Sequence, residues 1–322
     1  MELKTVVSMF FPALLAGAIT AGAQDSYPSR PVQLVTTISA GMTSDILARM
    51  FADKLTQRLG QPVIVQNKPG AGGTIATQAV AGAAPDGYTL LMINVGHSLN
   101  PFLYRNLPYD GLRDFAGVVL FAESPLVVLV NPQLGVRTLK EFIALAKQKP
   151  GTIYYPSAGV GTVTHLGGAY FASLAGIDLV HVPYKAMSAI IADLISGRVQ
   201  AAFFPPAMLS NFQGGKLLAL AVSSTEPLRE PVVLPTAREA ANLDYVMSNW
   251  SGIVAPAKTP VPILERLSRA IQEIAVEEDV KARYKTLGLA LRIVALRDFD
   301  AFMKADMERL GPVVKASGAT AN

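Results

Sequence analysis

Two short segments rich in small and hydroxyl-bearing residues, one in each half of the chain, carry the residue types best suited to binding an anion. They are residues 36–45 and 157–165. Each follows an apolar, β-like run and precedes a helical pattern, so backbone N–H groups at a helix start should face a small open space. The positive end of a helix favours a negative group there. The pair predicts a ligand held between two lobes.

Other kinds of chemistry find less support in the sequence. Serine, histidine and aspartate all occur, but Ser44 and Ser157 are not flanked as in the Gly-x-Ser-x-Gly motif of many hydrolases. The histidines are His97, His165 and His181, which lie far apart in sequence, and the chain has no cysteine. We therefore expect no metal and no cofactor, and expect each histidine to cap a loop or to form a hydrogen bond in a pocket. A secreted hydrolase that uses Ser157 or Ser44 stays as an alternative.

Two further loops and one acidic residue extend the candidate site. Residues 70–74 are rich in glycine but lack the full spacing of a dinucleotide-binding loop, so they predict a tight turn at a helix start. Residues 94–98 follow a predicted strand, and ligands of open α/β sheets collect beyond the carboxyl ends of strands. Asp45 has two interpretations, as a favourable charge at the helix N-terminus or as an acceptor of hydrogen bonds from the loop before it.

The elements that must position these segments alternate between strands and helices. The clearest helix covers residues 138–147, where Thr138 and Glu141 form a capping box. A second helix starts at Thr259-Pro260, and a third runs from about Asp298 to Leu310, before Gly311-Pro312. The predicted strands are residues 32–36, 63–65, 89–93, 126–130, 153–155, 179–182, 199–204 and 217–222. This alternation predicts an α/β fold with parallel or mixed sheets, and residues 115–130 could cross between lobes.

The N-terminus is predicted to be a secretory leader. A charged start is followed by a mostly apolar run over residues 6–19 and by Ala21-Gly22-Ala23, so we expect cleavage after Ala23 and residues 1–23 to be the signal peptide. The apolar run is shorter than the roughly 20 residues of a spanning helix, although a signal anchor is the alternative.

Composition limits the remaining possibilities. About 300 mature residues favour two domains, at roughly 150 residues per domain. The hydrophobic fraction of 51% fits a globular protein, and no second long apolar run follows the leader. Although the formal net charge is +4, the basic residues are scattered, so nucleic-acid binding is not predicted.

Several longer motifs are distributed over the whole mature chain. They include Tyr27-Pro28-Ser29-Arg30-Pro31, Asn67-Lys68-Pro69-Gly70-Ala71-Gly72-Gly73, Ala84-Pro85-Asp86-Gly87-Tyr88 and His181-Val182-Pro183-Tyr184-Lys185. Together they resemble the Bug (Bordetella uptake gene) family, the periplasmic receptors of tripartite tricarboxylate transporters. The resemblance implies a two-lobed periplasmic-binding-protein type II clamshell, each lobe a mixed sheet flanked by helices. Lobe one would comprise residues 24–124 and 247–322, and lobe two residues 125–246.

The function that the resemblance implies is non-catalytic capture of a small carboxylate in the periplasm. A monomer would close on the ligand and present it to the membrane permease subunits of such a transporter. A protein that presents its closed form to a sensor-kinase ectodomain is the alternative. The predicted ligand-binding residues are Ser39, Gly41, Thr43, Ser44 and Asp45 in the first loop, His97 and Ser98 beside it, and Ser157, Gly159, Gly161, Thr162 and Phe204 in the second lobe.

Two of the chain's departures from the usual family pattern bear directly on the ligand. Met42 and Thr43 stand where the family usually has glycines, which predicts a different loop conformation with fewer inward amides. Phe204 stands in a segment that often supplies a pocket carboxylate. If Phe204 faces the cleft, the ligand should have one carboxylate and an apolar or aromatic remainder; in the other interpretation the ring belongs to the core.

Overall fold

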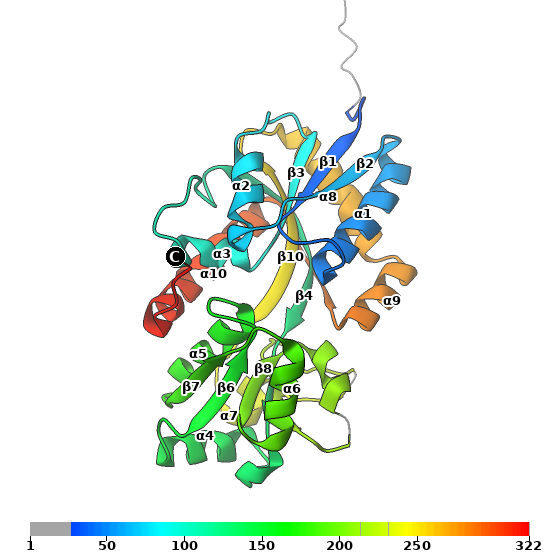
Figure 1. The fold of residues 1–322 in the computed structure, drawn as a ribbon. Helices are drawn as coiled ribbons and strands as arrows, with labels where there is room; N and C mark the ends of the chain where they lie inside the picture. Colours follow the sequence, from blue (N-terminus) through cyan, green and yellow to red (C-terminus); the bar gives the residue numbers. More distant parts are fainter. Residues whose placement is uncertain (1–26, 213, 231, 322) are drawn as a thin grey trace, which may run out of the picture.

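The computed structural model describes residues 27–212, 214–230 and 232–321, which form two lobes, drawn one above the other in Figure 1. The upper lobe is built on a six-stranded sheet and the lower lobe on a three-stranded and a two-stranded sheet. No helix among the described residues is long and apolar enough to span a membrane. Residues 1–26 lie outside the described residues, so the leader and its cleavage after Ala23 stay predictions.

The sheet of lobe one has the strand order β11-β4-β10-β3-β1-β2. Its central strands β1 and β3 run parallel, whereas β10 is antiparallel to both of its neighbours. The strands are β1 (Val32–Thr36), β2 (Val63–Asn67), β3 (Thr89–Asn94), β4 (Phe115–Pro125), β10 (Ser248–Pro256) and β11 (Ala290–Ala295). Because β1, β2 and β3 are parallel, their carboxyl ends lie at one edge, where loops can meet.

Helices cover both faces of this sheet. Buried residues of α1 (Thr43–Leu59), α8 (Val261–Ala275) and α9 (Glu278–Leu287) share one apolar core. Those of α2 (Thr74–Ala81), α3 (Gly96–Leu103) and α10 (Leu296–Ser317) belong to a second core on the other face. A short 3-10 helix, η1 (Ala71–Gly73), precedes α2. The inner strands β1, β3, β4 and β10 are therefore largely buried on both sides, as their continuous apolar character requires.

Lobe two combines the sheets β8-β5-β9 and β6-β7. The strands are β5 (Val127–Val130), β6 (Ile153–Ser157), β7 (Leu179–Pro183), β8 (Ala201–Phe204) and β9 (Leu218–Val222). The helices are η2 (Pro132–Leu134), α4 (Leu139–Gln148), α5 (Val163–Ala175), α6 (Met187–Ser196), η3 (Pro206–Phe212) and α7 (Ala237–Ala241). The pair β6 and β7 is parallel, and α5 follows β6 directly, as α1 follows β1 in lobe one.

The chain crosses between the lobes where one strand ends and the next begins. Strand β4 belongs to the sheet of lobe one and β5 to a sheet of lobe two, and Leu126 between them is fully buried. The crossing expected within residues 115–130 is thus confirmed. The lobe limits at residues 124 and 247 stay predictions.

One predicted helix end is wrong. Helix α10 continues through Gly311 and Pro312 to Ser317, although the sequence predicts a stop there. A Cβ on Gly311 would lie 2.6 Å from the Phe102 ring, so the glycine allows α10 to approach α3 closely. Val313 and Val314 beyond it are buried. This packing outweighs the cost of a proline inside a helix.

Candidate functional site

The first loop lies at the carboxyl end of β1 and leads into α1. Met42 is the residue before the first helical turn, in extended conformation (φ −76°, ψ 159°), and its side chain makes no capping hydrogen bond. Ser39, Gly41 and Thr43 are exposed and Ser44 is half-buried. The first backbone N–H groups of a helix have no partner within the helix, so this uncapped, exposed start can donate hydrogen bonds to an anion.

A buried carboxylate holds this loop from below. Asp45, which is 2% exposed, accepts hydrogen bonds from the Gly41 N–H (2.8 Å), from Asn67 Nδ2 (2.8 Å) and from Arg49 Nε (3.1 Å). Burial alone would raise the pKa of Asp45, but the hydrogen bonds from Asn67, Gly41 and Arg49 outweigh it and lower that pKa. The interpretation of Asp45 as an acceptor of loop hydrogen bonds is confirmed. Its carboxylate is buried and committed to the loop, so it positions the loop and does not face a ligand.

Asn67 completes the network of lobe one. It is the last residue of β2 and lies beside Thr36, the last residue of β1. Its Nδ2 group donates to Thr36 Oγ1 (2.9 Å) as well as to Asp45. The sequence interpretation missed Asn67; a polar residue ending a strand next to β1 was the signal that could have revealed it.

His97 and Ser98 lie inside lobe one, contrary to prediction. They are 4% and 0% exposed, in the first turn of α3, and His97 Nε2 is 2.8 Å from the Gly111 carbonyl oxygen. Burial lowers the pKa of His97, which keeps the ring neutral. The hollow beside His97, of about 10 Å³, is too small for an organic acid. Both side chains are therefore enclosed in lobe one, where a ligand between the lobes would not reach them in this conformation.

The second loop joins β6 to α5 and is held by two imidazole rings. His165 and His181 stack with ring centroids 3.8 Å apart and an interplanar angle of 26°. His165 Nδ1 accepts a hydrogen bond from the Gly161 N–H (3.1 Å), and His181 Nε2 lies 2.6 Å from Ser157 Oγ. Burial, with a smaller effect of His181, lowers the pKa of His165 to about 4, and burial lowers that of His181. Both rings are neutral at pH 7.

The polar groups of the second loop are largely used within the loop itself. Thr162 Oγ1 caps α5 by accepting from the His165 N–H and donates to the Gly159 carbonyl (2.7 Å). Ser157 Oγ is bonded to both the N–H and the carbonyl of Gly159. Ser157 is fully buried, so its predicted contact with a ligand is not possible in this conformation, whereas Gly159, Gly161 and Thr162 are partly exposed.

Phe204 belongs to the core of lobe two, so the prediction that it faces the cleft is wrong. It is fully buried among Val127, Leu129, Ile190 and Leu194. Its neighbour Phe203, on the other face of β8, is fully buried in the adjacent core. Because apolar clusters cover both faces of this sheet, either phase of β8 would have placed Phe204 in the interior.

The two loops lie at the ends of the lobes that face each other (Figure 1). A Cβ on Gly161 would be 3.2 Å from Leu103 Cδ1, so the second loop lies against α3 of lobe one. Arg309 of α10 lies over the Tyr170 ring of α5, 5.5 Å from its centroid. Gly161 of the second loop is thus placed where the lobes meet, whereas Phe204 is fully buried in lobe two.

Comparisons with known proteins agree with this arrangement. A family model described as tripartite tricarboxylate transporter family receptor matches residues 47–319. The chain belongs to this family. Protein BugT of Bordetella pertussis is 33% identical over 325 residues, which cover 99% of this chain and 98% of BugT. The resemblance to the Bug receptors is therefore confirmed.

Three solved structures are similar over almost their whole length. A TctC solute binding protein from Polaromonas, with no ligand, has a TM-score of 0.81 at 27% identity and covers 90% of this chain and 99% of its own. Rpa4515 of R. palustris with adipate has a TM-score of 0.74 at 29% identity, covering 91% and 99%. MatC from Rhodopseudomonas palustris with bound malate has a TM-score of 0.69 at 30% identity, and the match covers 89% of this chain and 100% of MatC. The predicted periplasmic-binding-protein fold is confirmed.

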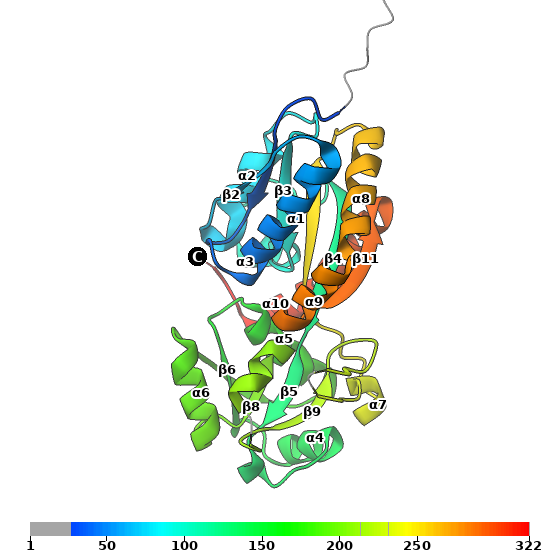
Figure 2. The same ribbon diagram turned by 90° about the vertical axis from the view of Figure 1, so that its right-hand side faces the viewer.

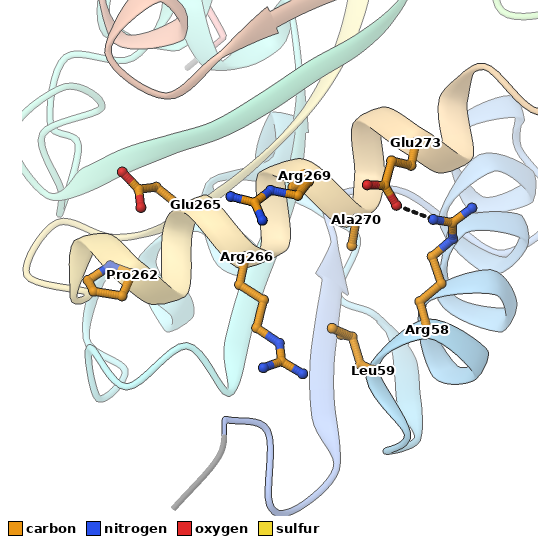
Figure 3. A pocket seen from close by; sticks show the side chains of 8 residues that line it. All are labelled: Arg58, Leu59, Pro262, Glu265, Arg266, Arg269, Ala270 and Glu273. Atoms are coloured by element: carbon orange, nitrogen blue, oxygen red, sulfur yellow. Dashed lines mark hydrogen bonds and ion pairs between the residues drawn. The ribbon is translucent and has the colours of Figure 1, made fainter. Parts of the chain in front are cut away.

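A separate hollow lies away from both loops. It is a groove of about 530 Å³ between the last turn of α1 and α8, shown in Figure 3. Arg58 crosses it and pairs with Glu273 and Glu277, while Arg266 and Arg269 line it from α8. Figure 2 shows α1 and α8 side by side on the outer face of lobe one. None of the predicted ligand residues lines this groove.

The hydrolase alternative finds little support in the site of this receptor. Ser157 and His181 are at hydrogen-bond distance, like a nucleophile and its base, but the Ser157 hydroxyl is fully buried. In the described part of the chain, no carboxylate bonds to His181, and no group of three or more His, Asp or Glu side chains is placed to hold a metal. The family is one of solute-binding receptors.

Proposed function

We propose that this chain is a periplasmic receptor that captures a small carboxylate between its lobes and delivers it to the membrane subunits of a tripartite tricarboxylate transporter. The observation that carries the proposal is the exposed, uncapped start of α1 above the buried Asp45. Such a helix start offers N–H groups and a positive potential to an anion. Two similar structures, solved with adipate and with malate, show that proteins of this fold bind carboxylates.

The first loop is proposed to make the primary contact with a ligand carboxylate. Ser39, Gly41, Thr43 and Ser44 are the residues whose backbone or hydroxyl groups are accessible there. The second loop would cover the ligand when the lobes close, through Gly159, Gly161 and Thr162. Ligand-driven closure shifts the protein toward the conformation that binds the ligand better.

The chemical nature of the rest of the ligand needs revision. The expected apolar or aromatic remainder depended on Phe204 facing the cleft, and Phe204 is buried. We therefore propose a small carboxylate without that restriction, and dicarboxylates such as adipate and malate become the first compounds to test.

The first test is a thermal-shift screen of residues 24–322 against dicarboxylates, tricarboxylates, amino acids and aromatic monocarboxylates. A ligand that binds only the folded state stabilises it by about 2.7 kcal/mol when its free concentration is 100 times Kd. We expect a dicarboxylate to raise the melting temperature. If no acid in the panel does so, carboxylate capture is the wrong function.

A proline scan of two helix starts tests the contact itself. Thr43 is the first residue of α1, a position that tolerates proline, and Met42 before it has the extended conformation that proline favours. Thr43→Pro removes one N–H donor and should weaken binding roughly tenfold, about 1.4 kcal/mol, with little change in stability. Val163→Pro makes the same change at the start of α5 and should leave affinity nearly unchanged. Equal losses would contradict the primary role of the first loop.

Export and delivery form the remaining part of the proposal. N-terminal sequencing of the exported protein should find a chain that begins at Gln24. Uptake of the identified acid should require both this receptor and a permease of the tripartite type. Binding without any effect on uptake would instead favour presentation of the closed form to a sensor-kinase ectodomain.

A further inference from the structure

The two ligand loops are held by equivalent networks of different chemistry. In lobe one, Asp45 is the third residue of α1 and accepts from the N–H of Gly41, four residues earlier. In lobe two, His165 is the third residue of α5 and accepts from the N–H of Gly161, also four residues earlier. Both glycines have positive φ, +84° and +79°. The position of the Asp45 carboxylate in lobe one, which stays ionised, is thus taken in lobe two by the His165 imidazole, which can gain a proton.

The equivalence extends to the neighbouring strand. Asn67 of β2 donates hydrogen bonds to Asp45 and to the hydroxyl of Thr36, at the end of β1. His181 of β7 stacks on His165 and bonds the strand-end hydroxyl of Ser157. Each loop therefore depends on a pair of side chains, Asp45 with Asn67 or His165 with His181, that ties the strand end to the glycine before the helix.

A proton on the imidazole pair is incompatible with its role in the loop. His165 accepts the Gly161 N–H at Nδ1, and a protonated imidazole has no acceptor nitrogen. A positive charge on one ring would also lie close to the other ring, because the two ring centroids are 3.8 Å apart. The neutral pair holds the loop, and the cationic pair must release Gly161.

The surroundings of the pair offer no compensating charge. Among the elements packed on α5, β6 contributes the phenol of Tyr155, β7 contributes His181, and β8 has no titratable side chain. From α10, Arg309 faces Tyr170, further along α5. No carboxylate in the described part of the chain bonds to either imidazole. An anion bound at the loop would supply a negative charge there.

We infer that His165 and His181 are the positioning residues of the second ligand loop, and that they hold the Gly161 amide only as a neutral pair. The inference deepens the proposed function, on which its ligand aspect rests, but the state of the loop can be measured without a ligand. Acidification releases the Gly161 N–H and leaves a positive ring beside it, so a carboxylate should bind more tightly as the pH falls.

The test is an NMR titration of the ligand-free chain from pH 8 to pH 4. Labelling with ¹⁵N-glycine reports the Gly161 and Gly41 amides, and the chain has only three histidines, so their ring signals can be assigned. We expect the chemical shift of the Gly161 amide to change and its hydrogen exchange with water to become faster. Both changes should have the same midpoint pH as the titration of the His165 and His181 rings. The Gly41 amide, held by Asp45, is the internal control and should not change over this range.

The matched variant is His165→Asn/His181→Gln. Asparagine offers an oxygen acceptor near the position of Nδ1, and glutamine a polar group near that of Nε2, but neither titrates. In this variant the Gly161 amide should be independent of pH. A wild-type Gly161 amide that stays protected while both rings gain protons would overturn the inference.

Adipate affinity, measured by calorimetry at pH 7.5 and at pH 5, tests the ligand aspect. We expect severalfold tighter binding at pH 5 for the wild-type chain and no such change in the double variant. Equal pH dependence in both would overturn the role in ligand binding. If no carboxylate binds at either pH, the proposed function fails, and the NMR titration still decides whether the pair holds the loop.

Discussion

The starts of α1 and α5 have almost the same backbone but different hydrogen-bonding capacity. The residue before each first turn is extended, with φ −76° and ψ 159° at Met42 and φ −72° and ψ 160° at Thr162. Thr162 caps its helix with its own hydroxyl, whereas Met42 has no group that could do so. The start of α1 therefore has backbone N–H donors that its own cap does not use and that a ligand can bind. At the start of α5, the Thr162 hydroxyl already accepts one of these hydrogen bonds. Equal geometry does not mean equal function when the side chain at one position differs.

The largest expected difference between the loops is in their response to acid. The pKa of His165 is lowered to about 4, below its usual 6.5, so the unfolded chain binds a proton more tightly than the folded one. The contribution of neutral His165 to the free energy of unfolding is fully present above pH 6.5. It is lost as the pH drops from 6.5 to 4, and amounts to about 3 kcal/mol for a shift of this size. Urea denaturation at pH 7.5, 5.5 and 4.5 measures it. The variant His165→Asn/His181→Gln should lose less stability; an identical loss would show that other groups cause it.

The second prediction breaks the network of lobe one. In Asp45→Asn, a buried carboxylate that accepts three hydrogen bonds is replaced by an amide. The amide NH₂ group would then face one of the donors that the carboxylate accepted from. We expect a loss of about 2 kcal/mol in the free energy of unfolding and weaker carboxylate binding. Asp53→Asn, at an exposed position of the same helix, is the control and should change neither quantity. Denaturation and calorimetry on both variants decide it.

A smaller effect is expected when the second loop loses its cap. Thr162→Ala removes the hydroxyl that accepts from the His165 N–H and donates to the Gly159 carbonyl. Loss of such a cap costs about 1 kcal/mol. Chemical denaturation should show this decrease at pH 7.5. A variant as stable as the wild type would mean that the cap contributes nothing and that the imidazole pair alone holds the loop.

The smallest effect sharpens the comparison by exchanging the caps. Met42→Thr introduces into the first loop the hydroxyl that the second loop has, on a backbone already suitable for it. We expect a gain of roughly 0.5–1 kcal/mol in stability together with weaker ligand binding, because the new cap uses a donor that the ligand needs. Both quantities are measured on one sample by thermal shift with and without adipate. Tighter binding would contradict the proposed use of that donor.

Much of the fold could be predicted from the sequence because its signals are local. The capping box of Thr138 and Glu141 and the strand at residues 32–36 depend on neighbouring residues, and both occur as predicted. Strands β10 and β11 were not predicted as separate strands. Their pairing with β4 joins residues far apart in the chain, and no local pattern encodes such a partner.

The sequence indicated which loops to inspect and could not give the roles of their side chains. Small residues marked both loops, and both loops lie at the ends of the lobes that face each other in Figure 1. The sequence could not show that Ser157, His97 and Ser98 are buried, or that Phe204 belongs to a core. Whether a strand residue faces outward depends on what covers the sheet, and helices distant in sequence provide that cover.

The sequence by itself determined the family, the alternation of strands and helices, and the two glycine-bearing loops before helices. These features depend on residue type and on spacing over a few residues, which are fixed before the chain folds. Only the tertiary structure decided that Asp45 pairs with Asn67 and His165 with His181, because parallel neighbouring strands bring those side chains together. The same packing removed water from the two imidazoles, and that loss of solvation lowers their pKa values and keeps both rings neutral at pH 7.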